Sequence, residues 1–121
     1  MLYSIDKQQY VREIPHQSEY RFWRSRVPPE QFQRVWDELN DRIDSDEIHT
    51  SSWMPGNNWE GTVFEPLAVA CGGDVDASGK FFGLILWDVM LNRDQVWSFG
   101  RYEKDGVPIQ GMTYFRLLVV P

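Results

Sequence analysis

The segment FFGLILWDVML, residues 81–91, is the longest apolar run in the chain and decides most of its fold. It carries a single charged side chain, Asp88, and it is well short of the roughly 20 apolar residues that cross a bilayer. Such a run is typical of a buried helix. Asp74 or Asp76 can cap it, so the sequence predicts a helix over 77–91 that is apolar on most of its circumference and covered on more than one side.

Asp88 places a carboxylate inside this apolar segment. At helical spacings of three, four and seven its neighbours are Phe81, Leu84, Ile85, Leu91 and Asn92. A carboxylate buried among such side chains needs a partner, and an arginine on a neighbouring strand is the natural one. We therefore predict a structural ion pair at Asp88 in preference to an acid–base role.

Two more helices are predicted before residue 77. Thr62 and Glu65 have the spacing of a capping box, and Gly72 and Gly73 form a stop signal, so a short helix is expected over 63–71. An amphipathic helix is expected over 29–43, where five apolar side chains recur at the three-and-four spacing of one helical face: Phe32, Val35, Trp36, Leu39 and Ile43.

The strands are predicted from β-branched and aromatic runs. EYRFWRSRV (19–27) reads as one strand, and MLYSI (1–5) or QYVREI (9–14) adds another. QVWSFGRYE (95–103) and GMTYFRLLVV (111–120) read as a hairpin, because KDG (104–106) supplies an Asp-Gly turn. The predicted fold is α+β: an antiparallel sheet of three or four strands with about three helices on one face.

Composition restricts the class of protein. The 121 residues fit a single domain, residues 1–121, and 42% hydrophobic content is enough to build a core without disulfides or metal. The lone cysteine, Cys71, cannot form an intrachain disulfide, and the N-terminus does not resemble a signal peptide, so a cytoplasmic location is expected. A net charge of -6 opposes binding to duplex nucleic acid, and no membrane association is expected.

The connection over residues 45–61 is the strongest functional lead, because loops of this length in a small domain usually have a purpose. Trp53 and Trp59 flank a Pro-Gly turn. We expect an ordered loop in which Trp59 anchors in the core and Trp53 forms the wall of a cleft, although both indoles could equally be plain core. The candidate ligand-binding residues of this loop are His49, Ser51, Ser52, Trp53, Asn57 and Asn58.

Arginines are the second lead. Arg24, Arg101 and Arg116 each share a strand face with aromatic side chains if these segments are strands, and they could hold a phosphate or carboxylate against the loop. The alternative is that they stack on the aromatics or pair with the surplus acids, and it is the one we favour.

Two functional hypotheses follow. The preferred one is a small binding module in which the loop and the strand arginines hold an aromatic or anionic small molecule, or a partner protein. The other is an enzyme of unfamiliar type that uses His49 and an arginine cluster. Binding is preferred because no nucleophile motif, metal-ligand spacing or phosphate loop is present, and no metal or cofactor is expected. We also expect a homodimer that covers exposed sheet aromatics.

Overall fold

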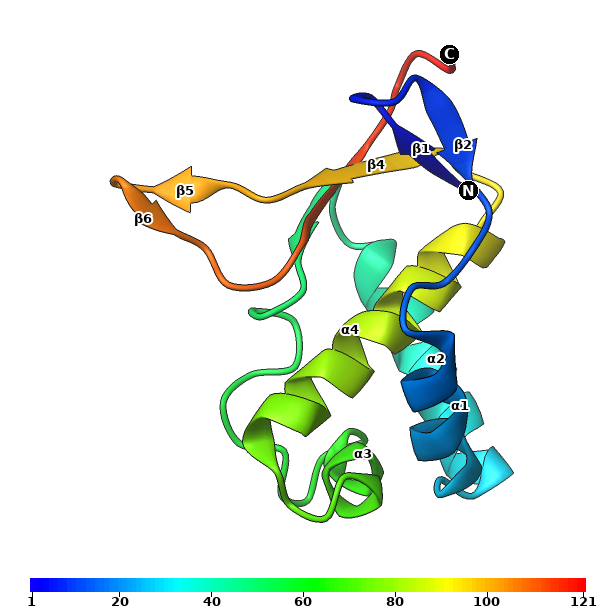
Figure 1. Ribbon diagram of the computed structural model, residues 1–121, viewed down its shortest axis with the longest axis vertical. Coiled ribbons are helices and arrows are strands. Elements are labelled where there is room, and N and C mark those ends of the chain that lie inside the picture. The colour runs from blue at the N-terminus through cyan, green and yellow to red at the C-terminus, as the bar shows by residue number, and fades with distance from the viewer.

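A computed structural model describes all residues, Met1–Pro121, and shows an α+β fold with four helices and a mixed sheet (Figure 1). The helices are α1 (Gln17–Ser25), α2 (Pro29–Ile43), α3 (Glu65–Ala70) and α4 (Val75–Asn92). The five-stranded sheet contains β1 (Leu2–Ser4), β2 (Gln9–Val11), β3 (Ile48–Thr50), β4 (Trp97–Gly100) and β7 (Thr113–Arg116). A separate two-stranded ribbon is formed by β5 (Glu103–Lys104) and β6 (Val107–Pro108).

The sheet lies at one end of the molecule and the helices lie together on one side of it (Figure 1). Its strand order is β2-β1-β4-β7-β3, and every pairing is antiparallel except that of β1 with β4. The predicted antiparallel sheet is therefore correct only in part. The parallel pair arises because β4 enters the sheet after the helices and lies beside the N-terminal strand, with Leu2 opposite Trp97. Parallel neighbours need such a long crossover, which no local pattern reveals.

Helix α4 is the centre of the core, as its apolar sequence predicts. It begins at Val75, slightly before the predicted start, and the Asp74 carboxylate accepts a hydrogen bond from the Ala77 amide at 2.9 Å. Phe81 and Ile85 have no exposed surface, and they lie in the same buried cluster as Trp97 of the sheet. None of the four helices has both the length and the apolar content to span a bilayer.

The prediction of a strand over 19–27 is wrong, because residues 19–25 belong to helix α1. Tyr20 is buried and Trp23 is half-buried at positions i and i+3 of one helical face, and the buried Val27 follows the end of α1. Phe22 lies on the opposite face and is 58% exposed. The helical spacing was present in the sequence, but aromatic content outweighed it in the prediction. Arg24 is consequently a helix residue and not a strand residue.

The C-terminal hairpin is confirmed in its pairing, with Phe99 opposite Tyr114 in β4 and β7. Asp105 and Gly106 have φ values of 54° and 77°, which are the positive values that a two-residue type I′ turn requires, and they join β5 to β6. Strand β7 covers only part of the predicted run over 111–120.

Strand β3 was not predicted. It forms inside the connection over 45–61 and pairs antiparallel with β7 at the edge of the sheet. The predicted loop is therefore shorter than its sequence suggested. Strand pairing with β7 orders its first part, because backbone amides and carbonyls that would otherwise need water find partners in the sheet.

The outer face of the sheet is not covered by a helix (Figure 1). The half-buried Tyr3 and Tyr10 of β1 and β2 pack edge to face with ring centroids 5.2 Å apart, and Ile48 lies opposite Phe115 with its side chain exposed. We expected a homodimer because exposed apolar side chains of this kind on a sheet are often covered by a second copy of the chain. The homodimer stays a prediction.

The Asp74 cap can be tested by mutation. Asp74→Ala leaves the Ala77 amide without its acceptor and should lower the free energy of unfolding by about 1 kcal/mol in urea denaturation. Asp76→Ala is the matched control, because it removes a carboxylate from the first turn of α4 without removing the cap and should cost only about 0.3–0.5 kcal/mol. Equal losses in the two variants would show that the charge, and not the cap, stabilises this helix end.

Candidate functional site

The loop after β3 is tied to the chain segment before β7 by three hydrogen bonds. The Ser51 amide donates to the Met112 carbonyl at 2.9 Å, and the Met112 amide donates back to Ser51 Oγ at 3.0 Å. The Ser52 hydroxyl donates to the Gln110 carbonyl at 2.7 Å. These reciprocal bonds hold the start of the loop against the base of the β5–β6 ribbon.

Trp59 anchors the far end of the loop, as predicted. Its ring packs on Phe64 and Phe82 with centroid distances of 6.1 and 5.9 Å, and its indole Nε1 donates to the Gly56 carbonyl at 3.1 Å. Trp53 is 60% exposed and contacts the Lys104 ammonium, 5.9 Å from its ring centroid. The two indoles therefore have different environments, and the anchored one is Trp59.

The capping box is present in a modified form. The Thr62 hydroxyl accepts from the Phe64 amide at 3.2 Å, and a Glu65 carboxylate oxygen accepts from the Gly61 amide at 2.5 Å. Both bonds lie in the turn before α3, which begins at Glu65 and not at residue 63 as predicted. Glu65 thereby fixes the chain where it leaves the loop.

A cavity of about 1000 Å³ lies between this loop, α3, the N-terminal half of α4 and the base of the ribbon; we call it the loop cleft. Trp53 does not line it, so the predicted cleft wall is not where the sequence placed it, and the half-buried ring of Trp59 lines it instead. The structure brings five of the predicted binding residues to the cleft: Ser51, Ser52, Asn57, Asn58 and Arg101.

The cleft has an apolar part next to the Trp59 ring. Phe82 and Val75 from α4 and Val69 from α3 line it. Phe82 is buried, whereas Val69 and Val75 are largely exposed, so the apolar surface continues from the core to the opening. A flat apolar ligand could bury this surface against Trp59.

The charged groups of the cleft are mostly acidic. Glu60, Glu65 and Asp76 supply three carboxylates, whereas Lys80 and Arg101 supply two cations. Lys80 is already paired, because its ammonium lies 2.8 Å from a carboxylate oxygen of Glu19 on α1. The salt bridge and the bond that this carboxylate accepts from Lys80 hold the pKa of Glu19 below its ordinary value. Arg101 is the cation left without a carboxylate partner.

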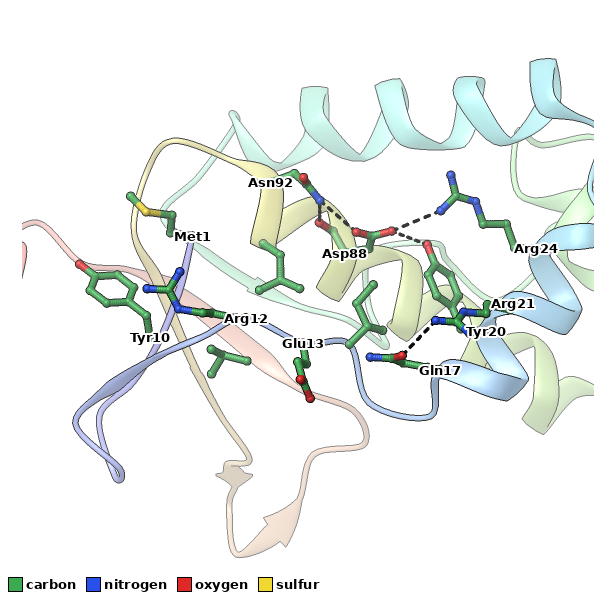
Figure 2. A pocket seen from close by; sticks show the side chains of 13 residues that line it. Met1, Tyr10, Arg12, Glu13, Gln17, Tyr20, Arg21, Arg24, Asp88 and Asn92 are labelled. Atoms are coloured by element: carbon green, nitrogen blue, oxygen red, sulfur yellow. Dashed lines mark hydrogen bonds and ion pairs between the residues drawn. The ribbon is translucent and has the colours of Figure 1, made fainter.

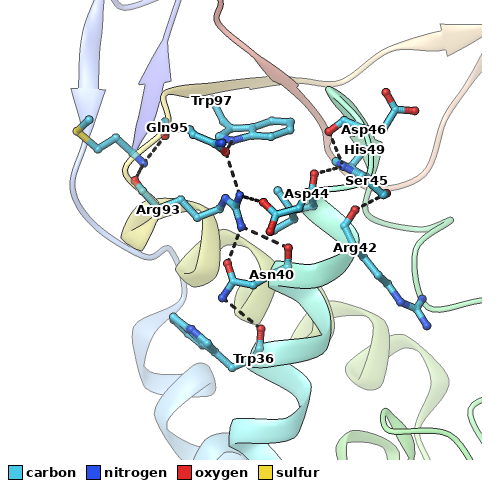
Figure 3. Close-up of polar contacts among 12 residues, drawn as sticks. Trp36, Asn40, Arg42, Asp44, Ser45, Asp46, His49, Arg93, Gln95 and Trp97 are labelled. Carbon is cyan, nitrogen blue, oxygen red and sulfur yellow. Dashed lines mark hydrogen bonds and ion pairs between the residues drawn. The ribbon is translucent and has the colours of Figure 1, made fainter.

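His49 lies outside the cleft. Its Nε2 is 2.9 Å from the Ile43 carbonyl at the end of α2 and 3.1 Å from the Asp46 carbonyl (Figure 3). Nε2 therefore carries a proton and donates to backbone oxygens, while the ring packs 5.7 Å from that of Trp97. His49 links α2 to the sheet, and no carboxylate orients it for acid–base chemistry as the enzyme hypothesis required.

The remaining predicted arginines are dispersed. Arg116 lies with Asp44 and Glu47 at a separate cavity of about 340 Å³, and Arg24 lines another cavity beside Asp88. Arg24 Nη1 is 3.7 Å from an Asp88 oxygen, so the predicted arginine partner of Asp88 exists but comes from a helix. The predicted cluster of strand arginines around the loop does not form.

Sequence reasoning missed a polar cluster around Arg93 (Figure 3). Its guanidinium donates to Asn40 Oδ1 at 2.7 Å and to Gln95 Oε1 at 2.9 Å, and it pairs with Asp44. These contacts join the end of α2 to the segment between α4 and β4. Because Asn40 and Asp44 lie 53 and 49 positions from Arg93, no motif could have identified the cluster.

Comparison with protein-family models, with curated proteins and with solved structures finds no match for this chain. No three of its His, Cys, Asp and Glu side chains form a group that could hold a metal ion. The cavities and the side chains that line them are therefore the features of the molecule that bear on its function.

The different environments of the two loop indoles predict different effects of their removal. Trp59→Ala should lower the free energy of unfolding by about 3 kcal/mol, because it deletes a ring packed on two core aromatics. Trp53→Ala should change it by less than about 0.5 kcal/mol, since that side chain is exposed. Urea melts of both variants measure the difference, and equal destabilisation would contradict the assigned anchor.

Gly111 allows the loop to approach the sheet. Its φ is 80°, and a Cβ added there would lie 2.3 Å from Ser51 Oγ. Gly111→Ala should therefore cost both the strain of positive φ and the Ser51 contacts, in total about 2–3 kcal/mol of unfolding free energy.

Gly106→Ala is the matched control, because it has a similar φ of 77° and open space around the added carbon. It should cost about 1 kcal/mol from backbone strain alone. Thermal or urea unfolding compares the two, and an equal cost would show that the approach of Ser51 contributes nothing.

Proposed function

We propose that the protein is a small-molecule binding module that holds a planar aromatic ligand in the loop cleft. The observation that carries this proposal is the position of Trp59: its ring is fixed by Phe64 and Phe82, yet it lines a cavity of about 1000 Å³. A rigid aromatic wall binds a flat ligand at little cost in conformational entropy, because its side chain is already ordered.

The polar groups of the cleft support recognition of such a ligand at its edges. Asn57 and Asn58 are exposed and line the cleft, and the Asn57 side chain makes no hydrogen bond within the protein. Arg101 is free of carboxylate partners and can donate to a ring carbonyl or stack on the ring face. A few fixed donors and acceptors around an apolar wall are the usual composition of small-molecule sites.

The charge of the cleft favours a neutral or cationic aromatic over an anion. Three carboxylates face it, and one of its two cations is neutralised by Glu19. An anionic ligand would approach like charge with only Arg101 to compensate. Nucleobases and other uncharged heteroaromatics are the ligand class that fits both the wall and the charge.

The proposal can be tested by NMR titration of the ¹⁵N-labelled protein with a panel of free nucleobases, indole and aromatic carboxylates. Neutral heteroaromatics should shift the Trp59 indole resonance and the amides of Asn57 and Asn58, whereas the aromatic carboxylates should bind more weakly. Absence of saturable shifts at this loop with every compound at millimolar concentration would overturn the proposal.

Gly79 offers a variant that fills the cleft without damaging the core. It lines the cleft from α4, and nothing lies within 4 Å of a carbon added to it. Gly79→Leu should abolish binding while leaving stability equal or higher, because leucine is a better helix former than glycine. Gly83→Leu is the matched control, since Gly83 is on the same helix, has equally open space and does not line the cleft. Equal binding by both variants would place the ligand elsewhere.

A further inference from the structure

A second cavity, of about 690 Å³, lies between the chain after β2, helix α1 and the C-terminal end of α4 (Figure 2). Asp88 lines it, so we call it the Asp88 pocket. It shares no lining residue with the loop cleft, and it therefore does not belong to the site proposed above. Its apolar lining includes Ile14 and Leu91.

Asp88 presents a buried carboxylate to this pocket, with 12% of its side chain exposed. The Tyr20 hydroxyl donates to Oδ2 at 2.7 Å, and the Asn92 amide donates to Oδ1 at 3.0 Å (Figure 2). A carboxylate can accept about four hydrogen bonds, so these two direct bonds leave acceptor capacity at each oxygen. Desolvation and the bond to Asp88 raise the pKa of Tyr20, which keeps this hydroxyl protonated as a donor.

Arg24 does not use up that capacity. Its Nη1 is 3.7 Å from Asp88 Oδ2, and its guanidinium carbon lies 4.3 Å from the centroid of the Phe32 ring on α2. The cation–π contact holds Arg24 at the side of the pocket, where it lowers the cost of burying the Asp88 charge without forming a close, bidentate pair. A donor on a ligand could therefore still reach the carboxylate.

Two further arginines of the pocket have no carboxylate partner. Arg21 makes one side-chain hydrogen bond, to Gln17 at 3.3 Å, and the Arg12 side chain makes none. Both guanidinium groups therefore have donors free for a ligand. With Glu13 included, the pocket carries three guanidinium groups and two carboxylates, so it is net positive in a protein of net charge -6.

The pocket thus offers a buried acceptor at Asp88 and unpaired, fork-shaped donors at Arg12 and Arg21. The arginines would attract a simple anion, but Asp88 would repel it. Asp88 would attract a simple cation, but the arginines would repel it. We propose that the Asp88 pocket binds a small zwitterion of the amino-acid or dipeptide class, with its ammonium group at Asp88 and its carboxylate at Arg12 or Arg21. The apolar side chains of Ile14 and Leu91 would contact the aliphatic part of such a ligand.

The experiment is a calorimetric or ligand-observed NMR titration of the wild-type chain with the twenty protein amino acids and the dipeptide Ala-Ala. At least one zwitterion should bind. Its N-acetyl derivative, which lacks the ammonium, and its amide, which lacks the carboxylate, should each bind about tenfold more weakly or worse, since each loses a charge-assisted hydrogen bond. No binding by any zwitterion would overturn the proposal, and equal binding by the N-acetyl derivative would do so as well.

Variants locate the site. Arg12→Gln and Arg21→Gln change exposed side chains, and at least one should weaken zwitterion binding about tenfold while leaving binding of the amide unchanged. Arg26→Gln is the matched control, because Arg26 is also exposed and on the α1 side of the molecule but lies over Phe22, outside the pocket. A uniform effect of all three substitutions would indicate a loss of general positive charge and contradict the assigned carboxylate position.

Asp88→Asn tests the ammonium position and should abolish the preference for the free amine over the N-acetyl form. Thermal unfolding of Asp88→Asn is measured in parallel to check that the variant folds. Tyr20→Phe removes one hydrogen bond to Asp88 but leaves its charge in place, so this variant should keep the preference for the free amine. Gly79→Leu should leave zwitterion binding unchanged, because it alters only the loop cleft. The two sites are thereby tested independently.

Discussion

Burial of helix α4 is the constraint on which the rest of the structure depends. Its apolar surface is too large to be covered from one side, so the sheet, α1, α2 and α3 all pack around it. Removing this much apolar area from water supplies most of the driving force for folding. The few polar residues of the helix therefore lie toward its two ends, where they line the two cavities.

Both candidate sites are consequences of that arrangement. Near the start of α4, Gly79 and Lys80 face the loop cleft, and near its end, Asp88 and Asn92 face the second pocket. The loop is held over the first of these by Trp59 and by the close approach of Gly111 to Ser51. A rigid helix therefore positions side chains in both sites, which favours preorganised binding over induced closure.

The two cavities differ in the side chains that line them. Trp59 can line the loop cleft because packing on Phe64 and Phe82 holds its ring in place. In the second pocket, Arg24 compensates the buried carboxylate of Asp88 while it stacks on Phe32. The sequence predicted one site for an aromatic or anionic ligand, whereas the structure has two separate cavities with different lining residues.

The sequence by itself determined the features that depend on near neighbours. The three-and-four spacing of apolar residues predicted α2, the long apolar run predicted α4, the Asp-Gly pair predicted the turn, and the position of Trp59 before the α3 turn identified the anchoring indole. Tertiary structure alone decided the parallel pairing of β1 with β4, the formation of β3, and the cavity that each arginine lines. Tyr20 and Asp88 are 68 positions apart, and their hydrogen bond exists because α1 packs beside α4. Local patterns record which face of an element is apolar, but they do not record which other element will cover that face, because that is settled by the packing of the whole chain.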